Sequence, residues 1–239
     1  MSSVSDPTGS FPVPSPPLLV ADDVSKSFGI TQALNGASLK VFAGEVLALT
    51  GPSGSGKSTL LHCLSGILAP DSGRVTFEGH DLTALSDRER SALRRGAFGF
   101  VFQFGQLVPE LTCLENVALP LRLAGRRRKQ AERLAAELLA DLEVTEVAGK
   151  RPGQVSGGQG QQVAVARALI NTPRMIFADE PTGSLDSRNG EQVMRLLVAA
   201  AKQRGSAVVL VTHEAFIAAC ADREVAFADG AAVAPAVAR

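Results

Sequence analysis

A glycine-rich stretch ahead of a lysine has the residue types and spacing that bind phosphate. It matches the pattern G-x-x-x-x-G-K-[ST] and consists of Gly51, Pro52, Ser53, Gly54, Ser55, Gly56, Lys57, Ser58 and Thr59. Glycines let backbone N–H groups curl around a phosphate chain, and a helix beginning there adds the positive end of its dipole. We expect Lys57 to neutralise the β- and γ-phosphates of a nucleotide and the Ser58 hydroxyl to bind Mg²⁺. The alternative is an ordinary glycine-rich turn.

Two adjacent carboxylates, Asp179 and Glu180, follow the apolar run RMIFA at 174–178. A carboxylate at the end of a strand beside a phosphate loop can hold Mg²⁺, which is the role we expect for Asp179. Glu180 could then polarise an attacking water. Two acids before a proline are equally typical of a turn. Because the chain also has a phosphate loop, we favour the catalytic interpretation.

The elements around these residues alternate between short apolar runs and helical spacing. The run EVLALT at 45–50 predicts a buried strand directly before the loop, and 58–68 has the spacing of a helix directly after it. Residues 20–28 and 37–41 are short runs that mix apolar and polar residues, and further strands are predicted at 74–77 and 99–103. The short apolar runs 174–178 and 206–212 flank a predicted helix at 190–203. This order favours right-handed crossover units in a mainly parallel sheet.

Residues from about 104 to 168 are rich in helix-forming sequence. Within them Leu134, Leu138, Leu139 and Leu142 fall on one face of a predicted amphipathic helix. We therefore expect a helical subdomain at about 104–168, inserted into an α/β core.

The composition fits one large domain, which we place at 17–239, preceded by a disordered proline-rich tail at 1–16. The 24 Lys and Arg balance the 24 Asp and Glu, so the overall charge predicts neither a nucleic-acid nor an anionic-membrane partner held by bulk electrostatics, and any partner must be recognised locally. No apolar run is long enough to span a bilayer, and the first residues lack the features of a secretory signal, so we expect a soluble chain.

We interpret the basic run 126–129 as a solvated loop and helix start rather than an anion-binding patch.

The cysteines are Cys63, Cys113 and Cys220, which lack the spacing of metal ligands. They favour a reducing cytoplasm, where we expect them to serve as small apolar fillers.

A third motif, Ser156, Gly157, Gly158 and Gln159, is followed by VAVARAL at 163–169 and resembles the signature of the ABC family of ATPases. The phosphate loop alone would also fit kinases and GTPases. The resemblance includes Gln103 after a predicted strand, the run from Asp179 to Asp186, and His213 after VVLVT, and it extends from about residue 20 to 230. It implies an α/β P-loop NTPase core with a mainly parallel sheet, an antiparallel β edge and an inserted α-helical signature subdomain.

The resemblance also implies ATP hydrolysis by a homodimer, with ATP and Mg²⁺ as cofactors. Two copies would pack head to tail, with Ser156, Gly157, Gly158 and Gln159 of one copy closing over the γ-phosphate held by Lys57 of the other. Gln103 would sense the γ-phosphate and touch Mg²⁺ and water, and Asp186 would communicate across the dimer. His213 would stabilise the transition-state phosphate or hold the water geometry.

Phe28 stands where the family places an aromatic that stacks on adenine, although a core phenylalanine is the alternative. The chain departs from the family pattern at Val155, Gly160 and Gln162, where a bulkier or basic residue is common, and this puts the rate of turnover in doubt.

Within the family, 102–121 and the run PTGSLD at 181–186 look like the lipoprotein-releasing and macrolide-efflux branch. That branch implies a separate membrane permease with a cytoplasmic coupling helix, and a cytoplasmic location on the inner face of the plasma membrane. The apolar residues between Leu107 and Leu121 would form the groove for that helix, or else only the core of the subdomain. The alternative function is a soluble ABC ATPase in DNA repair or translation, which the absence of heptads and metal-spaced cysteines disfavours.

Overall fold

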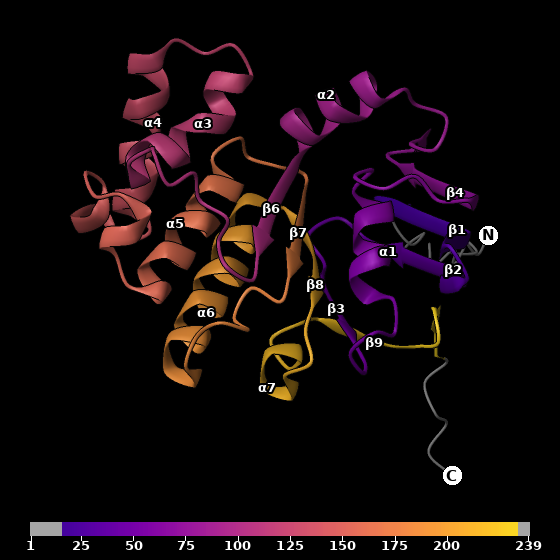
Figure 1. Ribbon diagram of the computed structural model, residues 1–239. Coiled ribbons are helices and arrows are strands. Elements are labelled where there is room, and N and C mark those ends of the chain that lie inside the picture. Colours follow the sequence, from indigo (N-terminus) through magenta and orange to yellow (C-terminus); the bar gives the residue numbers. More distant parts are fainter. Residues whose placement is uncertain (1–15, 234–239) are drawn as a thin grey trace, which may run out of the picture.

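The computed structural model describes residues 16–233 of the chain (Figure 1). The predicted proline-rich tail lies outside the described residues except for Pro16. Within residues 16–233, none of the helices combines the length and the apolar character that crossing a membrane requires.

A six-stranded sheet forms the centre of the fold, in the order β10-β9-β3-β8-β7-β6. Pairs β3–β8, β3–β9, β6–β7 and β7–β8 are parallel, and only β9–β10 is antiparallel, which confirms the mainly parallel sheet. The strands are β3 (Val46–Thr50), β6 (Phe98–Phe102), β7 (Met175–Asp179), β8 (Ala207–Val211), β9 (Arg223–Ala228) and β10 (Ala231–Ala232).

A second, antiparallel sheet has the order β2-β1-β4-β5. Its strands are β1 (Leu19–Phe28), β2 (Thr31–Val41), β4 (Ser72–Phe77) and β5 (His80–Asp81). The mixed run at 37–41 is the second half of β2, and the first half carries further polar residues. The short strands β5, β9 and β10 were not predicted.

Helices cover both faces of the parallel sheet. In Figure 1, α1 lies between the two sheets, while α5 and α6 cover the opposite face. The helices are α1 (Lys57–Leu64), α2 (Asp87–Ala97), α3 (Cys113–Leu123), α4 (Arg128–Asp141), α5 (Gly157–Leu169), α6 (Ser187–Arg204) and α7 (Ala215–Ala218), with 3₁₀ turns η1 (Thr145–Val147) and η2 (Pro152–Gln154).

The boundaries of two predicted helices were wrong. The helix predicted at 58–68 ends at Leu64, where the chain turns through Gly66 at φ 64°. The helix predicted at 190–203 begins at Ser187, because the Asp186 side chain caps it by accepting the Asn189 N–H.

Helix α2 was not predicted at all. It has no buried residue, so its apolar spacing is too weak to indicate a helix. Its start carries a readable signal, since Ser86 and Glu89 form a capping box in which each side chain accepts the other's backbone N–H.

The parallel strands are buried on both faces, which explains why they are nearly continuous apolar runs. Along β7, Met175 and Phe177 pack on the α1 side, and Ile176 and Ala178 pack on the α5 and α6 side. Helices α3 and α4 pack into the same hydrophobic core as α5, α6 and that face of the sheet. The limits of a separate helical subdomain at 104–168 therefore stay a prediction.

Two smaller predictions can be compared with the structure. In α4 and the turn that follows it, Leu138, Leu139 and Leu142 are buried and Leu134 is half-buried against the same core. Cys63 and Cys113 are buried as expected of apolar fillers, and burial raises the pKa of the Cys63 thiol to about 12. Cys220 is only half-buried.

Phe177→Ala should test the core on the α1 side. The ring is fully buried and packs edge-on against Phe98, with centroids 5.1 Å apart. Its removal leaves a cavity, so we expect the free energy of unfolding to fall by about 3–5 kcal/mol in denaturant titration. The matched change Phe216→Ala, at a half-exposed ring, should cost below about 0.5 kcal/mol. Equal losses from both variants would contradict this account of the core.

Candidate active site

The phosphate loop is held so closely that two of its glycines have no room for a side chain. A Cβ at Gly51 would lie 2.0 Å from the Phe227 carbonyl oxygen, and one at Gly56 would lie 2.2 Å from that of Ala33. Both glycines also have positive φ, 140° and 101°. The loop is therefore packed between β9 and β2, and α1 begins directly after Gly56.

Lys57, the first residue of α1, folds back into this loop. Its side chain is buried, with 5% of the residue exposed, and Nζ donates to the carbonyl oxygens of Gly51 at 2.8 Å and Pro52 at 2.7 Å. The loop thus concentrates a cation and backbone N–H groups at one helix start, which is the electrostatic setting that binds phosphate. A cavity of about 260 Å³ lies there, lined by Thr31, Gln32, Ala33, Ser53, Gly54, Gly56, Lys57, Ser58, Thr59 and Glu180.

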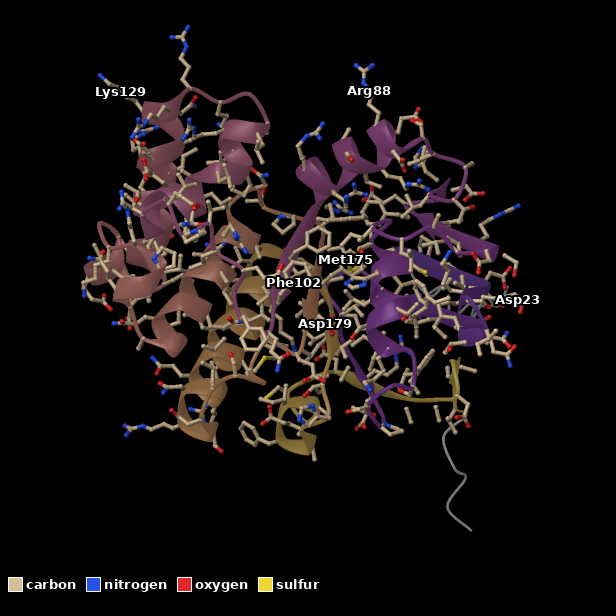
Figure 2. The ribbon with its side chains drawn as sticks, in the orientation of Figure 1. Asp23, Arg88, Phe102, Lys129, Met175 and Asp179 are labelled. Atoms are coloured by element: carbon tan, nitrogen blue, oxygen red, sulfur yellow. The ribbon has the colours of Figure 1, made fainter. Side chains whose placement is uncertain are left out.

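Ser58 connects the loop to the end of β7. Its Oγ donates to Asp179 Oδ1 at 2.9 Å, and Figure 2 labels Asp179 close to the centre of the molecule. Burial raises the pKa of the Asp179 carboxyl, and the Ser58 hydrogen bond opposes that shift. Two oxygen donors next to a phosphate site suit Mg²⁺, which binds through few protein ligands plus phosphate and water. Within residues 16–233, no group of three or more His, Cys, Asp or Glu side chains is arranged so that it could hold a metal ion by itself.

The backbone conformation of Glu180 sets the direction of its side chain. It adopts φ 45°, in the left-handed region that non-glycine residues rarely occupy, and its N–H donates to the Val211 carbonyl oxygen at 3.0 Å. His213, just after β8, has Nδ1 3.1 Å from Glu180 Oε1. Strain of this kind persists where the surrounding contacts impose it, so β7 and β8 together fix the position of this carboxylate.

Gln103 reaches the same place from the end of β6. A Cβ built on Gly183 would lie 2.8 Å from Gln103 Nε2 and 3.1 Å from Glu180 Oε2, so both side chains surround Gly183. A cavity of about 400 Å³ is lined by Ser58, Phe102, Gln103, Phe104, Gln106, Asp179 and Glu180. The structure therefore brings together the residues predicted from four separate segments, at the carboxyl ends of parallel strands.

Three residues that hold the loop after β6 were missed. Gln161 Nε2 donates to the Phe102 carbonyl oxygen at 2.8 Å, and Arg167 donates to those of Gly105 at 2.6 Å and Gln106 at 2.8 Å. Ser184 Oγ donates to the Gln103 carbonyl oxygen at 2.7 Å. For Gln161 and Arg167 the available signal was a polar side chain on the largely buried helix α5, because such groups need partners.

The Ser-Gly-Gly-Gln motif forms the start of α5. Ser156 is the N-cap and accepts the Gln159 N–H at 3.3 Å, while Gln159 accepts the Ser156 N–H and donates to Glu146 Oε1. Asp186 is the N-cap of α6, and the Asn189 N–H holds the pKa of its carboxyl below the usual value. A cavity of about 310 Å³ lies beside the motif. It is lined by Ser156, Gly158 and Gln159 of the motif and by Glu143, Glu146, Gln162, Asn189, Gln192 and Val193.

This motif does not reach the phosphate loop of its own chain. Helix α1 and the loop lie with the core on one face of the parallel sheet, and α5 lies on the other (Figure 1). None of the residues that line the motif's cavity lines either cavity at the phosphate loop. The phosphate loop and the motif of one chain therefore line separate cavities.

Phe28 and Gln162 line neither of the two cavities at the phosphate loop. Phe28 ends β1, is 53% exposed, and does not line the cavity at the phosphate loop, which receives Thr31, Gln32 and Ala33 instead. Gln162 is buried beside Glu143 and Glu146 in the motif's cavity, whose lining includes no cationic residue.

A separate groove of about 610 Å³ lies between α2, β6, α3 and α5. Of the apolar residues predicted between 107 and 121, only Leu119 and Pro120 line it. Cys113, Val117, Ala118 and Leu121 are buried in the core, so most of that segment fits the core alternative. The rest of the groove comes from Ile67, Ser91, Arg94, Arg95, Phe98, Gly99, Phe100, Phe102, Gln106, Leu123, Arg167, Ala168 and Asn171, which were not predicted.

Known proteins resemble this chain over most of its length. The family model described as ABC transporter matches residues 34–183. The chain is 46% identical over 202 residues to the lipoprotein-releasing system ATP-binding protein LolD 2 of Caulobacter vibrioides, covering 84% of this chain and 89% of that protein. It is 44% identical over 218 residues to the macrolide export ATP-binding/permease protein MacB of Marinobacter nauticus, covering 90% of this chain and 34% of that larger protein.

Among solved structures, the fold matches the ATP-binding cassette MJ0796 in a dimeric, post-hydrolysis state bound to ADP and Pi. The TM-score is 0.83 at 38% identity, with 90% of this chain and 97% of that chain covered. The fold class predicted from the sequence is thereby confirmed.

Gly183→Ala should test whether Gln103 and Glu180 must converge. The new Cβ would meet only the flexible ends of these two side chains, so we expect normal stability but at least roughly tenfold slower ATP hydrolysis. Steady-state turnover and thermal unfolding measure the two effects. Gly96→Ala in α2, where no heavy atom lies within 4 Å, is the control and should leave turnover unchanged. Unaltered hydrolysis by Gly183→Ala would show that the convergence is unnecessary.

Proposed function

The chain belongs to the ABC transporter family, and from this premise we propose that it is the ATP-hydrolysing subunit that drives a separate membrane permease. The observation that carries the proposal is the convergence of Lys57, Ser58, Asp179 and Glu180 on one site, with the Ser-Gly-Gly-Gln motif on the far side of the sheet. Its relatives are transport and lipoprotein-releasing proteins, which gives no support to the alternative in DNA repair or translation.

The phosphate loop and the strand ends perform complementary parts of the reaction. Backbone N–H groups of the loop and the Lys57 ammonium bind the phosphates of ATP and offset the charge of the leaving group. Glu180 orients water towards the γ-phosphate and accepts its proton, and His213 holds Glu180 through the contact at Nδ1. Gln103, beside Glu180, positions the same water.

Ser58, Asp179 and Gln103 would hold Mg²⁺. Their oxygen atoms are the ligand type that this ion prefers, and Ser58 and Asp179 are already in contact. When bound, the ion neutralises charge on the phosphate oxygens. The residues of the chain supply the alignment that phosphoryl transfer requires.

A head-to-tail homodimer completes the site. Ser156, Gly157, Gly158 and Gln159 present a helix start and backbone N–H groups suited to an anion, and they face away from the phosphate loop of their own chain. A second copy brings this anion site over the γ-phosphate. Asp186 and Asn189, beside the motif, lie where the two copies meet, and Phe28 contributes a ring for adenine.

The groove between α2 and α3 receives a short amphipathic helix of the permease, which places the chain on the cytoplasmic face of the membrane. Its walls combine aromatic and aliphatic side chains with arginines. Phe102 and Gln106 line both this groove and the catalytic cavity, so a helix in the groove contacts the wall of the site. The permease is of the kind that serves lipoprotein release or macrolide export, and it selects the substrate.

Glu180→Gln should separate binding from hydrolysis. The amide keeps the shape of the side chain but cannot accept a proton, so kcat should fall by at least roughly 100-fold while ATP affinity is kept. ATP held without turnover should make the dimer persist in gel filtration. Lys57→Ala serves as the contrast, because it should lose nucleotide affinity and remain monomeric with ATP. A hydrolysis rate unchanged by Glu180→Gln would remove Glu180 from this role.

Mixing two inactive variants should test the composite site. Lys57→Ala removes the loop's cation, and Ser156→Arg blocks the motif on the other half-site. A heterodimer of the two contains one intact pair of half-sites, so an equimolar mixture should recover about one quarter of wild-type ATPase activity. Each variant alone, at the same total concentration, is the control. Absence of any recovery would show that the two half-sites do not combine across copies.

A further inference from the structure

Two basic segments flank the groove. Helix α2 (Asp87–Ala97) carries four arginines against two carboxylates, and the turn between α3 and α4, at 122–129, carries five basic residues and no acidic one. The chain as a whole has no net charge, so this concentration is local. The sequence predicts the run 126–129 as a solvated loop and helix start, which fits the start of α4 at Arg128, and it does not predict α2.

Most of these cations are not neutralised by the protein. Arg90 pairs with Asp87, and Arg128 pairs with Glu115 and Glu132. Within these two segments, the exposed cations that form no ion pair with the described residues 16–233 are Arg88, Arg95, Arg122, Arg126, Arg127 and Lys129, which we call the basic edge.

One residue from each flank of the groove shows that the two flanks face the same direction. In Figure 2 the labelled side chains of Arg88 and Lys129 project from the same edge of the molecule, although they come from α2 and α4. Between them lies the groove, lined by Arg95 from α2 and Leu123 from α3. Leu123 is 61% exposed, which adds an apolar side chain next to Arg122. Cations with an apolar neighbour on one face suit the interface of a membrane.

We propose that the basic edge binds the anionic phospholipid surface of the membrane directly, on both flanks of the groove. A surface of lipid phosphates attracts clustered lysine and arginine over a Debye length, about 10 Å at 0.1 M salt. Long side chains such as those of Arg126 and Lys129 can reach this layer from an exposed turn. The lipid contact orients the groove towards the permease helix before that helix is bound.

A nucleic acid is the other polyanion that such a surface could bind, and it is disfavoured here. Single-stranded binding adds aromatic side chains that stack on bases, and neither 86–97 nor 122–129 contains one. The basic edge also borders the groove proposed for a membrane partner, which matches a lipid surface in position.

Sedimentation of the purified chain with vesicles tests the proposal. Binding to vesicles of phosphatidylglycerol in phosphatidylcholine should exceed binding to pure phosphatidylcholine and should weaken as salt is raised. Each cation contributes roughly fivefold, so Arg126→Gln/Arg127→Gln/Lys129→Gln should lower partitioning roughly 100-fold. Arg88→Gln, on the other flank, should lower it roughly fivefold.

A matched triple, Lys40→Gln/Lys150→Gln/Arg188→Gln, removes the same charge from exposed positions outside both segments and should bind vesicles as the wild type does. Equal losses from both triples would overturn the proposal, because they would indicate attraction by net charge alone. Duplex or single-stranded DNA binding more tightly than vesicles at equal salt would also overturn it. The proposal goes beyond the proposed function, and vesicle binding requires neither hydrolysis nor a permease, so the two can fail separately.

Discussion

The hydrogen bond between Ser58 and Asp179 joins the two parts of the molecule on which the site depends. One part is the phosphate loop, held between β9 and β2 by contacts that leave no space for a side chain at Gly51 or Gly56. The other is the carboxyl end of β7, whose next residue, Glu180, is held in a left-handed conformation by a hydrogen bond to β8. Because parallel strands end at the same edge of a sheet, residues far apart in the chain meet there without any of them moving.

The same sheet also imposes a separation. With α1 on one face and α5 on the other, the phosphate loop and the Ser-Gly-Gly-Gln motif of one chain belong to different surfaces. In the proposed homodimer a second copy unites them, so assembly is part of the proposed chemistry. The loop after β6 is the element best placed to transmit a change, since Phe102 and Gln106 line both the catalytic cavity and the groove while Gln161 and Arg167 tie that loop to α5.

The cation of the phosphate loop and the cations beside the groove have different surroundings. The phosphate loop keeps its cation buried among carbonyl oxygens, whereas the cations that flank the groove are exposed and mostly unpaired within the described residues. A chain with no net charge therefore presents two cationic regions with different tasks. One suits a small, tightly held polyanion, and the other suits a broad, weakly held surface.

The sequence by itself determined the phosphate loop, the two carboxylates and the mainly parallel sheet, because each depends on local spacing or on buried strands that are apolar throughout. It predicted the signature motif, Gln103 and His213 through resemblance, since a single amide or imidazole after a strand has no distinctive pattern. Tertiary structure alone decided that α2 exists as a wall of the groove, that Gln161, Arg167 and Ser184 hold the loop after β6, and that α2 and the α3–α4 turn share an edge. These features depend on contacts between segments distant in the chain, and their residues carry no period that reports such contacts.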